Sequence, residues 1–196
     1  MSNILEVKNL TMHYETIDGD VDAVKNVSFN VKAGESFGIV GESGCGKTSV
    51  AMSLLQLQAE NGKISNGSIL FDGLELVGMS ENDLRKVRWD GISIVFQGAM
   101  NAWNPVVKIG EQIREAMREH SPESSKSQNT LKINELFTMV GLDSSVADRF
   151  PHELSGGMKQ RAIIALALSC DPKLVIADEP TTALDVVIQL SLIHIS

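Results

Sequence analysis

The 196-residue sequence has little cysteine, fewer basic than acidic residues, and no long apolar run. Its two cysteines, Cys45 and Cys170, lie far apart and form no metal-binding spacing, which indicates a reducing, cytosolic compartment. The 17 basic and 25 acidic residues give a net charge of −8. This balance argues against nucleic acid as a main partner, because a phosphate backbone is bound by a basic face.

From its residue pattern we expect neither a membrane span nor a signal peptide in this sequence. Its longest apolar helical run, Ala162–Cys170, is too short for a bilayer, which needs about 20 apolar residues. The first nine residues lack the basic stretch and following apolar stretch of a signal peptide. If the protein acts at a membrane, we therefore expect another chain to cross it.

What the sequence does contain is an alternation of strand and helix patterns. Residues 4–14 and 23–35 alternate apolar and polar side chains, which predicts an antiparallel β layer. Residues 36–40 are short, apolar and followed by glycines, which predicts a buried central strand, and residues 47–58 follow with helical spacing. Further strand patterns cover residues 66–73, 91–97 and 173–180, and helical patterns cover 80–88, 109–120, 131–142 and 157–169.

These patterns predict an α/β fold with a mostly parallel core sheet and an inserted helical subdomain. Polar residues 121–129 predict a surface linker between two helices of that subdomain. The expected division is a core with its β layer at 1–96 and 155–189, the helical subdomain at 97–154, and an atypical tail at 190–196.

The stretch GESGCGKT, residues 41–48, matches the phosphate-binding pattern G-x-x-x-x-G-K-[ST] between a predicted strand and a predicted helix. Glycines let backbone N–H groups turn toward phosphate oxygens, and the helix directs its positive end at them. Lys47 would contact the β- and γ-phosphates and Thr48 would bind Mg²⁺. Cys45 is either a reactive thiol or simply a small residue tolerated in the loop. The predicted nucleotide-binding residues here are Gly41, Glu42, Ser43, Gly44, Cys45, Gly46, Lys47, Thr48 and Ser49.

The stretch LVIADEP, residues 174–180, predicts a strand buried on both faces that ends in two acids. Asp178 would reach the Mg²⁺ shell, and Glu179 would act as the general base on a water that attacks the γ-phosphate. Acids after a strand are common, but their position behind a phosphate loop favours this role.

The stretch LSGGMKQR, residues 154–161, predicts a second anion site at the start of a helix. Ser155, Gly156 and Gly157 would supply a hydroxyl and backbone N–H groups, and a second site far from the first implies that it serves a neighbour's nucleotide. With these three motifs, the sequence resembles the nucleotide-binding domain of an ABC transporter, an ABC-type P-loop NTPase, from residue 4 to about residue 189.

The resemblance implies further roles. It implies that ATP and Mg²⁺ are bound, with Glu179, Gln97 and Lys47 as the catalytic set and Thr48, Gln97 and Asp178 as metal ligands. Tyr14 would stack on adenine, the alternative being a packing role. Residues 182–185 would form a dimer-contacting loop.

Residues 95–113, VFQGAMNAWNPVVKIGEQI, resemble those of ATP-binding subunits of dipeptide, oligopeptide and nickel importers. Met100 and Trp103 would then face the permease, although core packing is the alternative for Trp103. The resemblance implies four features of the assembly: a second ABC ATPase subunit in a homo- or heterodimer, integral-membrane permease subunits, an extracytoplasmic solute-binding protein as an indirect partner, and a cytoplasmic position at the inner face of the membrane. The alternatives are a soluble ABC ATPase without a permease and a non-catalytic fragment.

The C-terminal residues 190–196 break the family pattern and resemble vector read-through. The family's switch histidine is expected on a further strand, and His194 is only nine residues past Asp185, so His194 is not assigned that role. We therefore expect this chain to bind nucleotide but to hydrolyse it poorly, and to expose apolar surface near its C-terminus.

Overall fold

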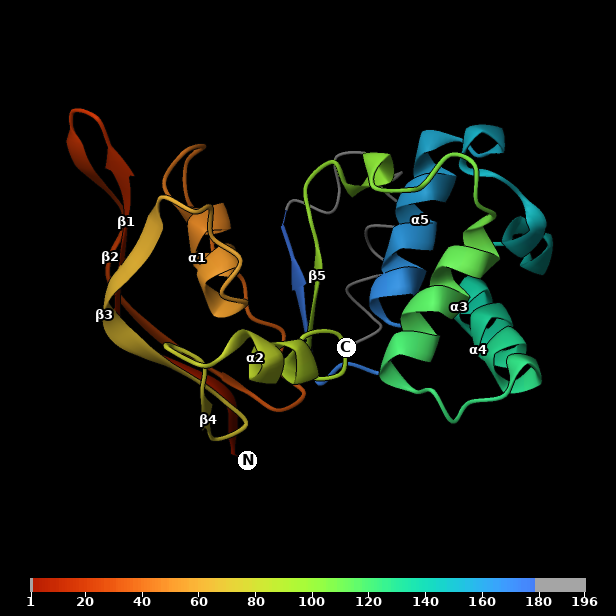
Figure 1. The fold of residues 1–196 in the computed structure, drawn as a ribbon, viewed down its shortest axis with the longest axis horizontal. Coiled ribbons are helices and arrows are strands. Elements are labelled where there is room, and N and C mark those ends of the chain that lie inside the picture. Colours follow the sequence, from red (N-terminus) through yellow and green to blue (C-terminus); the bar gives the residue numbers. More distant parts are fainter. Residues whose placement is uncertain (1, 179–196) are drawn as a thin grey trace. The chain divides into compact units, whose positions relative to one another are not determined.

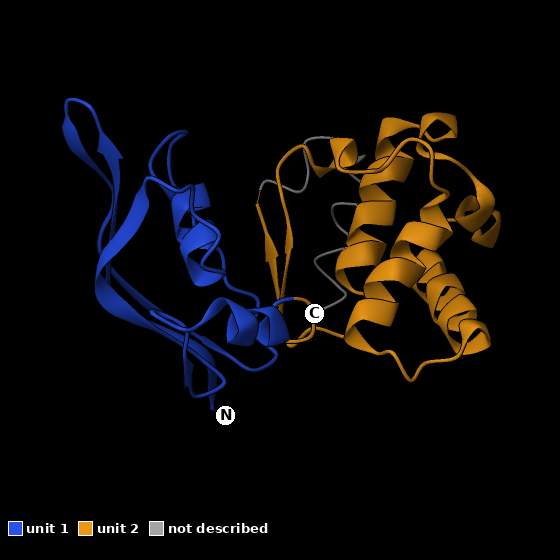
Figure 2. Ribbon diagram, viewed as in Figure 1, with its two compact units in different colours: residues 1–88, 196 blue, residues 89–195 orange. Residues whose placement is uncertain are grey.

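The structure is a computed structural model, and it describes residues 2–178. Contacts divide the chain into two compact units, the first ending at Arg88 and the second starting at Trp89 (Figure 2). The predicted insertion of residues 97–154 into a core of 1–96 and 155–189 stays a prediction. No helix in the described residues is long and apolar enough to span a bilayer.

The first unit is built on an antiparallel sheet with the strand order β2-β1-β3-β4 (Figure 1). Its strands are β1 Asn3–Thr16, β2 Gly19–Lys32, β3 Gly62–Phe71 and β4 Leu74–Glu75. The strands β1 and β2 form a long hairpin that turns between Thr16 and Gly19. The predicted antiparallel β layer is therefore present.

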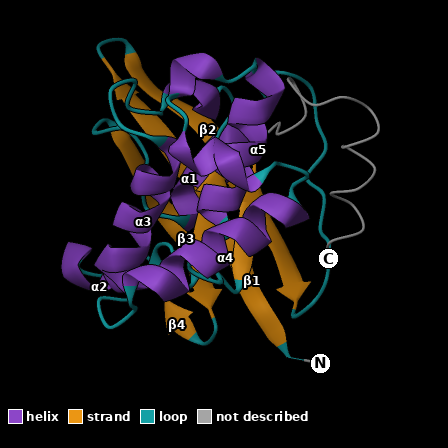
Figure 3. Cartoon of the chain, turned by 90° about the vertical axis from the view of Figure 1, so that its right-hand side faces the viewer, coloured by secondary structure: helices purple, strands orange, loops and turns teal. Residues whose placement is uncertain are grey.

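Helix α1, Lys47–Leu54, lies over one face of this sheet (Figures 1 and 3) and contacts β2. Helix α2, Glu81–Val87, begins as predicted at Ser80, whose side chain accepts a hydrogen bond from the Asp83 amide. The core of this unit alternates along the strands and includes Leu5, Val7, Leu10, Met12, Val24, Ile69 and Phe71.

The predicted central strand at residues 36–40 is wrong for this structure. Residues 36–40 form no strand, and Phe37 instead stacks on Phe29 of β2 with ring centroids 5.1 Å apart. A strand inside a parallel sheet depends on hydrogen-bonded partners, and no strand pairs with this segment among residues 2–178. Its apolar composition was therefore insufficient to predict a strand.

The second unit pairs two parallel strands with a group of helices (Figure 1). The strands are β5 Ile92–Val95 and β6 Leu174–Ala177. The helices are α3 Ile109–His120, α4 Lys126–Met139 and α5 Gly156–Ala167, with short 3₁₀ turns at Ala99–Asn101, Ser144–Asp148 and Pro151–Glu153.

The helices of this unit enclose a continuous apolar core, and Trp103 belongs to it. The ring is buried, and its Nε1 lies 3.4 Å from the Lys159 carbonyl oxygen to which it donates. Core packing, the alternative left open by the sequence, is therefore what the structure shows for Trp103. The other members include Ile109, Ile113, Ile133, Phe137, Val146 and Ala162.

Two local predictions in this unit need correction. The predicted linker 121–129 is helical from Lys126 onward, because Ser125 and Gln128 form a capping box that starts α4 there. Strand β6 is not buried on both faces: successive side chains of a strand point to opposite sides, and Val175 is 40% exposed.

Candidate functional site

The glycine-rich loop at residues 41–46 leads directly into α1, as the motif predicts. Gly46 is the N-cap residue with φ 94°, and Gly44 has φ 80°, a conformation that side chains other than glycine rarely adopt. Helix N-termini bind anions because the first amides have no partner within the helix. The loop therefore places a helix N-terminus where a phosphate would be expected.

Lys47 lies over this loop. Its ammonium donates to the carbonyl oxygens of Gly41 and Glu42, each 2.8 Å away, and its Nζ is 4.0 Å from the Cys45 sulfur. These are exposed bonds that a triphosphate could replace with stronger charge-assisted ones. The loop backbone, the ammonium and the helix N-terminus converge, so the residues present fit a nucleotide phosphate chain.

Gly46 also packs so closely on β2 that a side chain does not fit there. A Cβ at Gly46 would collide with the carbonyl oxygen of Ala23, whereas a Cβ at Gly44 would meet nothing within 4 Å. Both glycines have positive φ. Comparing alanine substitutions at Gly44 and Gly46 therefore separates the effect of the steric collision from the effect of backbone strain.

We expect Gly46→Ala to weaken MgATP binding at least about tenfold more than Gly44→Ala, because only the first must displace the start of α1 from β2. Calorimetric titration with MgATP would measure both affinities. Equal losses in the two variants would contradict this role of the Gly46 contact.

Tyr14 of β1 is joined to α1. Its hydroxyl oxygen lies 3.3 Å from the Ser49 hydroxyl oxygen, within hydrogen-bonding distance. This bond connects two predicted nucleotide-binding residues that are 35 positions apart in sequence. The predicted stacking of Tyr14 on adenine stays a prediction.

In the second unit, Gln97 and Asp178 follow the carboxyl ends of the two parallel strands. Val95 pairs with Ala177, and the Asp178 amide donates to the Val95 carbonyl oxygen at 2.9 Å. The Asp178 residue is 8% exposed. Ligands of α/β sheets bind outside this edge, which suits the predicted Mg²⁺-binding role of both residues. Glu179, the loop at 182–185, His194 and the tail 190–196 lie outside the described residues.

The predicted second anion site lies at the start of α5. Ser155 is the N-cap residue, and its Oγ accepts a hydrogen bond from the Met158 amide at 3.3 Å. Gly156 adjoins Met100, whose sulfur would lie 3.7 Å from a Cβ at this glycine. The Arg161 guanidinium donates to the carbonyl oxygens of Gly141 at 2.6 Å and Gly157 at 3.3 Å.

Arg161 therefore fixes the first turn of α5 to the end of α4. Sequence reasoning missed this contact, although the residue lies within the quoted motif. The first turn of a helix offers amides to an anion, so anchoring this turn would preserve the geometry of the predicted site at Ser155, Gly156 and Gly157. Their action on a neighbour's nucleotide stays a prediction.

The two thiols differ in their surroundings. Cys45 is exposed in the loop, whereas Cys170 is half-buried. Burial raises the pKa of the Cys170 thiol, and the nearby carboxylates Asp90 and Asp171 add to the increase. Cys170 therefore holds less of its reactive thiolate form near neutral pH than an ordinary cysteine does.

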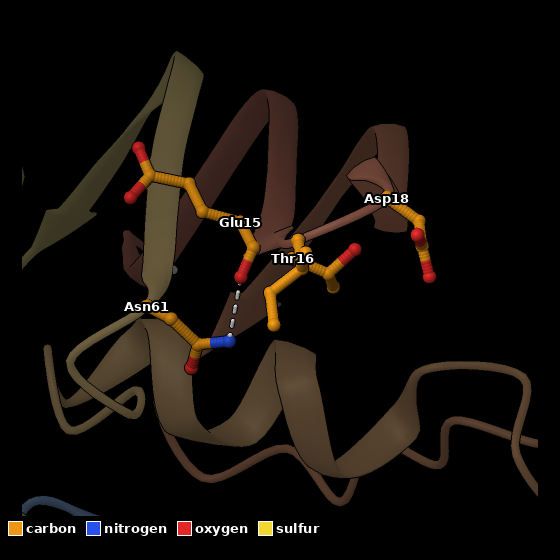
Figure 4. A pocket seen from close by; sticks show the side chains of 5 residues that line it. Glu15, Thr16, Asp18 and Asn61 are labelled. Carbon is orange, nitrogen blue, oxygen red and sulfur yellow. Dashed lines mark hydrogen bonds between the residues drawn. The ribbon is translucent and has the colours of Figure 1, made fainter.

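A surface depression lies elsewhere in the first unit, beside the β1–β2 turn (Figure 4). It is lined by Glu15, Thr16, Ile17, Asp18 and Asn61. The Asn61 amide group donates to the Glu15 carbonyl oxygen at 3.0 Å, so it is engaged in holding β1. The two carboxylates make this depression unsuited to phosphate.

Comparison with known proteins identifies the family of this chain. Residues 24–182 match the ABC transporter family. The chain is 45% identical over 193 residues to the dipeptide transport ATP-binding protein DppD of Lactococcus lactis, covering 97% of this chain and 55% of the relative. It is 45% identical over 197 residues to the oligopeptide transport ATP-binding protein OppD of Haemophilus influenzae, covering 96% of this chain and 58% of the relative. The chain thus spans little more than half the length of these relatives.

A solved structure has the same fold. The dimeric ATP-binding cassette MJ0796, in a post-hydrolysis state with ADP and Pi bound, superposes with a TM-score of 0.86 at 30% identity. The match covers 97% of this chain and 80% of that one. The predicted α/β fold of the ABC-type ATPase class is therefore confirmed, and the chain belongs to the ABC transporter family.

Proposed function

We propose that this chain is the ATP-binding and hydrolysing subunit that powers an ABC importer of dipeptides or oligopeptides. The observation that carries the proposal is the loop at residues 41–46, over which Lys47 holds its ammonium 2.8 Å from two loop carbonyls at the start of α1. Such a loop in a member of this family favours a nucleoside triphosphate as its ligand.

The peptide class is supported by the relatives. Both bacterial proteins described above are named for dipeptide or oligopeptide transport. Identity of 45% over nearly the whole chain favours the same substrate class here. We therefore propose peptides as the transported substrate in preference to nickel, the alternative that the sequence also allows.

In the proposed reaction, Lys47 would contact the β- and γ-phosphates, while Thr48, Gln97 and Asp178 would hold Mg²⁺. Bound Mg²⁺ would neutralise charge that develops on the phosphate oxygens. Glu179 accepts the proton of the attacking water as general base, and Gln97 orients that water. Tyr14 contacts the adenine ring. Of this set, Glu179 lies outside the described residues.

The proposed assembly is a dimer of ABC ATPase subunits at the cytoplasmic face of a membrane. Ser155, Gly156 and Gly157 act on the ATP of the opposite subunit, which is a second copy or a related chain. The dimeric state of MJ0796 supports this arrangement. The dimer would drive permease subunits in the membrane, which receive peptide from an extracytoplasmic binding protein.

Copurification tests the importer proposal against a soluble ABC ATPase that works without a permease. The affinity-tagged protein is expressed in its host, membranes are solubilised in mild detergent, and bound chains are identified by mass spectrometry. We expect integral-membrane permease subunits to be recovered. Recovery of ribosomes or DNA with no membrane protein would refute the importer function.

A further inference from the structure

Arg88, the residue after α2, binds the far end of the helix that follows the phosphate loop. Its guanidinium donates through Nε to the Leu55 carbonyl oxygen at 2.9 Å and through Nη2 to the Gln56 carbonyl oxygen at 3.1 Å. A third bond runs from Nη1 to the Glu81 carboxylate at 2.7 Å. The Arg88 side chain is only 18% exposed, whereas that of Glu81 is 63% exposed.

The two carbonyls that Arg88 binds lie at a strained turn. Gln56 has φ 52°, a left-handed conformation that is unfavourable for a residue other than glycine. The turn closes α1 through bonds from the Gln56 amide to the Ser53 carbonyl and from the Leu57 amide to the Met52 carbonyl. Those bonds do not involve the carbonyl oxygens of Leu55 and Gln56, and Arg88 is the donor to both of them.

Helix α1 has little stability of its own. It has eight residues, no acidic residue in its first turn and no basic residue in its last turn. Isolated helices of this length are marginal in water. Arg88 therefore supplies the positive charge that the last turn of α1 lacks. Its guanidinium lies at the negative end of the helix dipole, where a cation is stabilising.

From this geometry we propose that Arg88 is a positioning residue for the nucleotide site. The inference rests on the proposed function, because it takes the loop at residues 41–48 to be a phosphate site. By fixing the strained turn at the C-terminal end of α1, Arg88 fixes where the helix N-terminus and Lys47 lie. The guanidinium acts through α1 and does not contact the phosphates.

The test compares the MgATP affinities of variants that each remove a different subset of the hydrogen bonds made by Arg88. Arg88→Lys keeps the charge but loses the planar fork that binds two carbonyls together. Glu81→Gln is the matched control, since it weakens the exposed ion pair and keeps both carbonyl bonds. Arg88→Ala combined with Gln56→Gly removes the fork and relieves the left-handed strain at once.

We expect Arg88→Lys to raise the MgATP dissociation constant about fivefold to tenfold, and Glu81→Gln to change it less than about twofold. Arg88→Ala should lower MgATP affinity less in a Gln56→Gly background than in the wild type, a comparison that cancels the lost bond from the Gln56 Nε2 to the Ser53 carbonyl oxygen. Calorimetric titrations are made well below each melting temperature, so the affinity measured is that of folded protein. If Arg88→Ala does not fold, the MgATP affinities of Arg88→Lys and Glu81→Gln alone decide whether the proposal holds.

The outcomes are distinct. Unchanged MgATP affinity in Arg88→Lys, even with a lower melting temperature, would mean that Arg88 is only structural and would overturn the proposal. An equal loss of MgATP affinity from Arg88→Ala in both backgrounds would also overturn it, because Arg88 would then not act through the strained turn. If the wild-type chain binds no MgATP, the proposed function fails instead.

Discussion

Replacing Lys47 by alanine is expected to weaken MgATP binding about a hundredfold or more. The Lys47 ammonium lies over the loop and makes exposed contacts to two carbonyl oxygens and the Cys45 sulfur, so it can turn to phosphate oxygens without leaving a buried charge unpaired. Without it, the loop backbone and the helix N-terminus would face the triphosphate with no full positive charge. The loss should therefore be large while the fold is retained.

Calorimetric titration with MgATP measures this loss, and circular dichroism checks the fold. Lys63→Ala is the matched control, because Lys63 is an exposed residue of β3 and its removal changes the net charge equally. Lys63→Ala should bind MgATP as the wild type does. Wild-type affinity in Lys47→Ala would remove Lys47 from the phosphate site.

The second large effect is expected at Glu179. Glu179→Gln should keep MgATP affinity within about twofold and lower steady-state phosphate release at least about a hundredfold, because the amide cannot accept the proton of the attacking water. Phosphate release is measured on the protein copurified with its permease.

Glu123→Gln is the control for Glu179→Gln, because Glu123 is exposed in the turn before α4. It should turn over ATP normally. Unchanged turnover in Glu179→Gln would assign the general base to another residue. Loss of binding together with turnover would indicate instead that the carboxylate has a structural or metal-binding role.

Local sequence signals predicted much of the fold. The helical pattern at residues 80–88 corresponds to α2 with Ser80 as its N-cap, and the helix at residues 109–120 has the predicted bounds. These features depend on residues within one or two turns of each other. The capping box at Ser125 is equally local, but the polar composition around it predicts a linker instead.

Features that depend on distant partners could not be predicted in this way. The apolar segment 36–40 suggested a strand, but strand formation depends on pairing rather than on composition. Arg88 binds carbonyls 32 and 33 positions away, and Arg161 binds one 20 positions away. A basic residue in a sequence carries no sign of such bonds, so both positioning contacts emerged only from the structure.

The phosphate site itself is tested most directly by MgATP protection of Cys45. Its exposed sulfur lies within the loop, 4.0 Å from the Lys47 Nζ, and the half-buried Cys170 in the other unit is an internal reference. We predict that saturating MgATP slows maleimide labelling of Cys45 at least about tenfold and leaves the rate at Cys170 unchanged. Labelling of Cys45 at the same rate with and without MgATP would contradict the assignment of this loop as the nucleotide site.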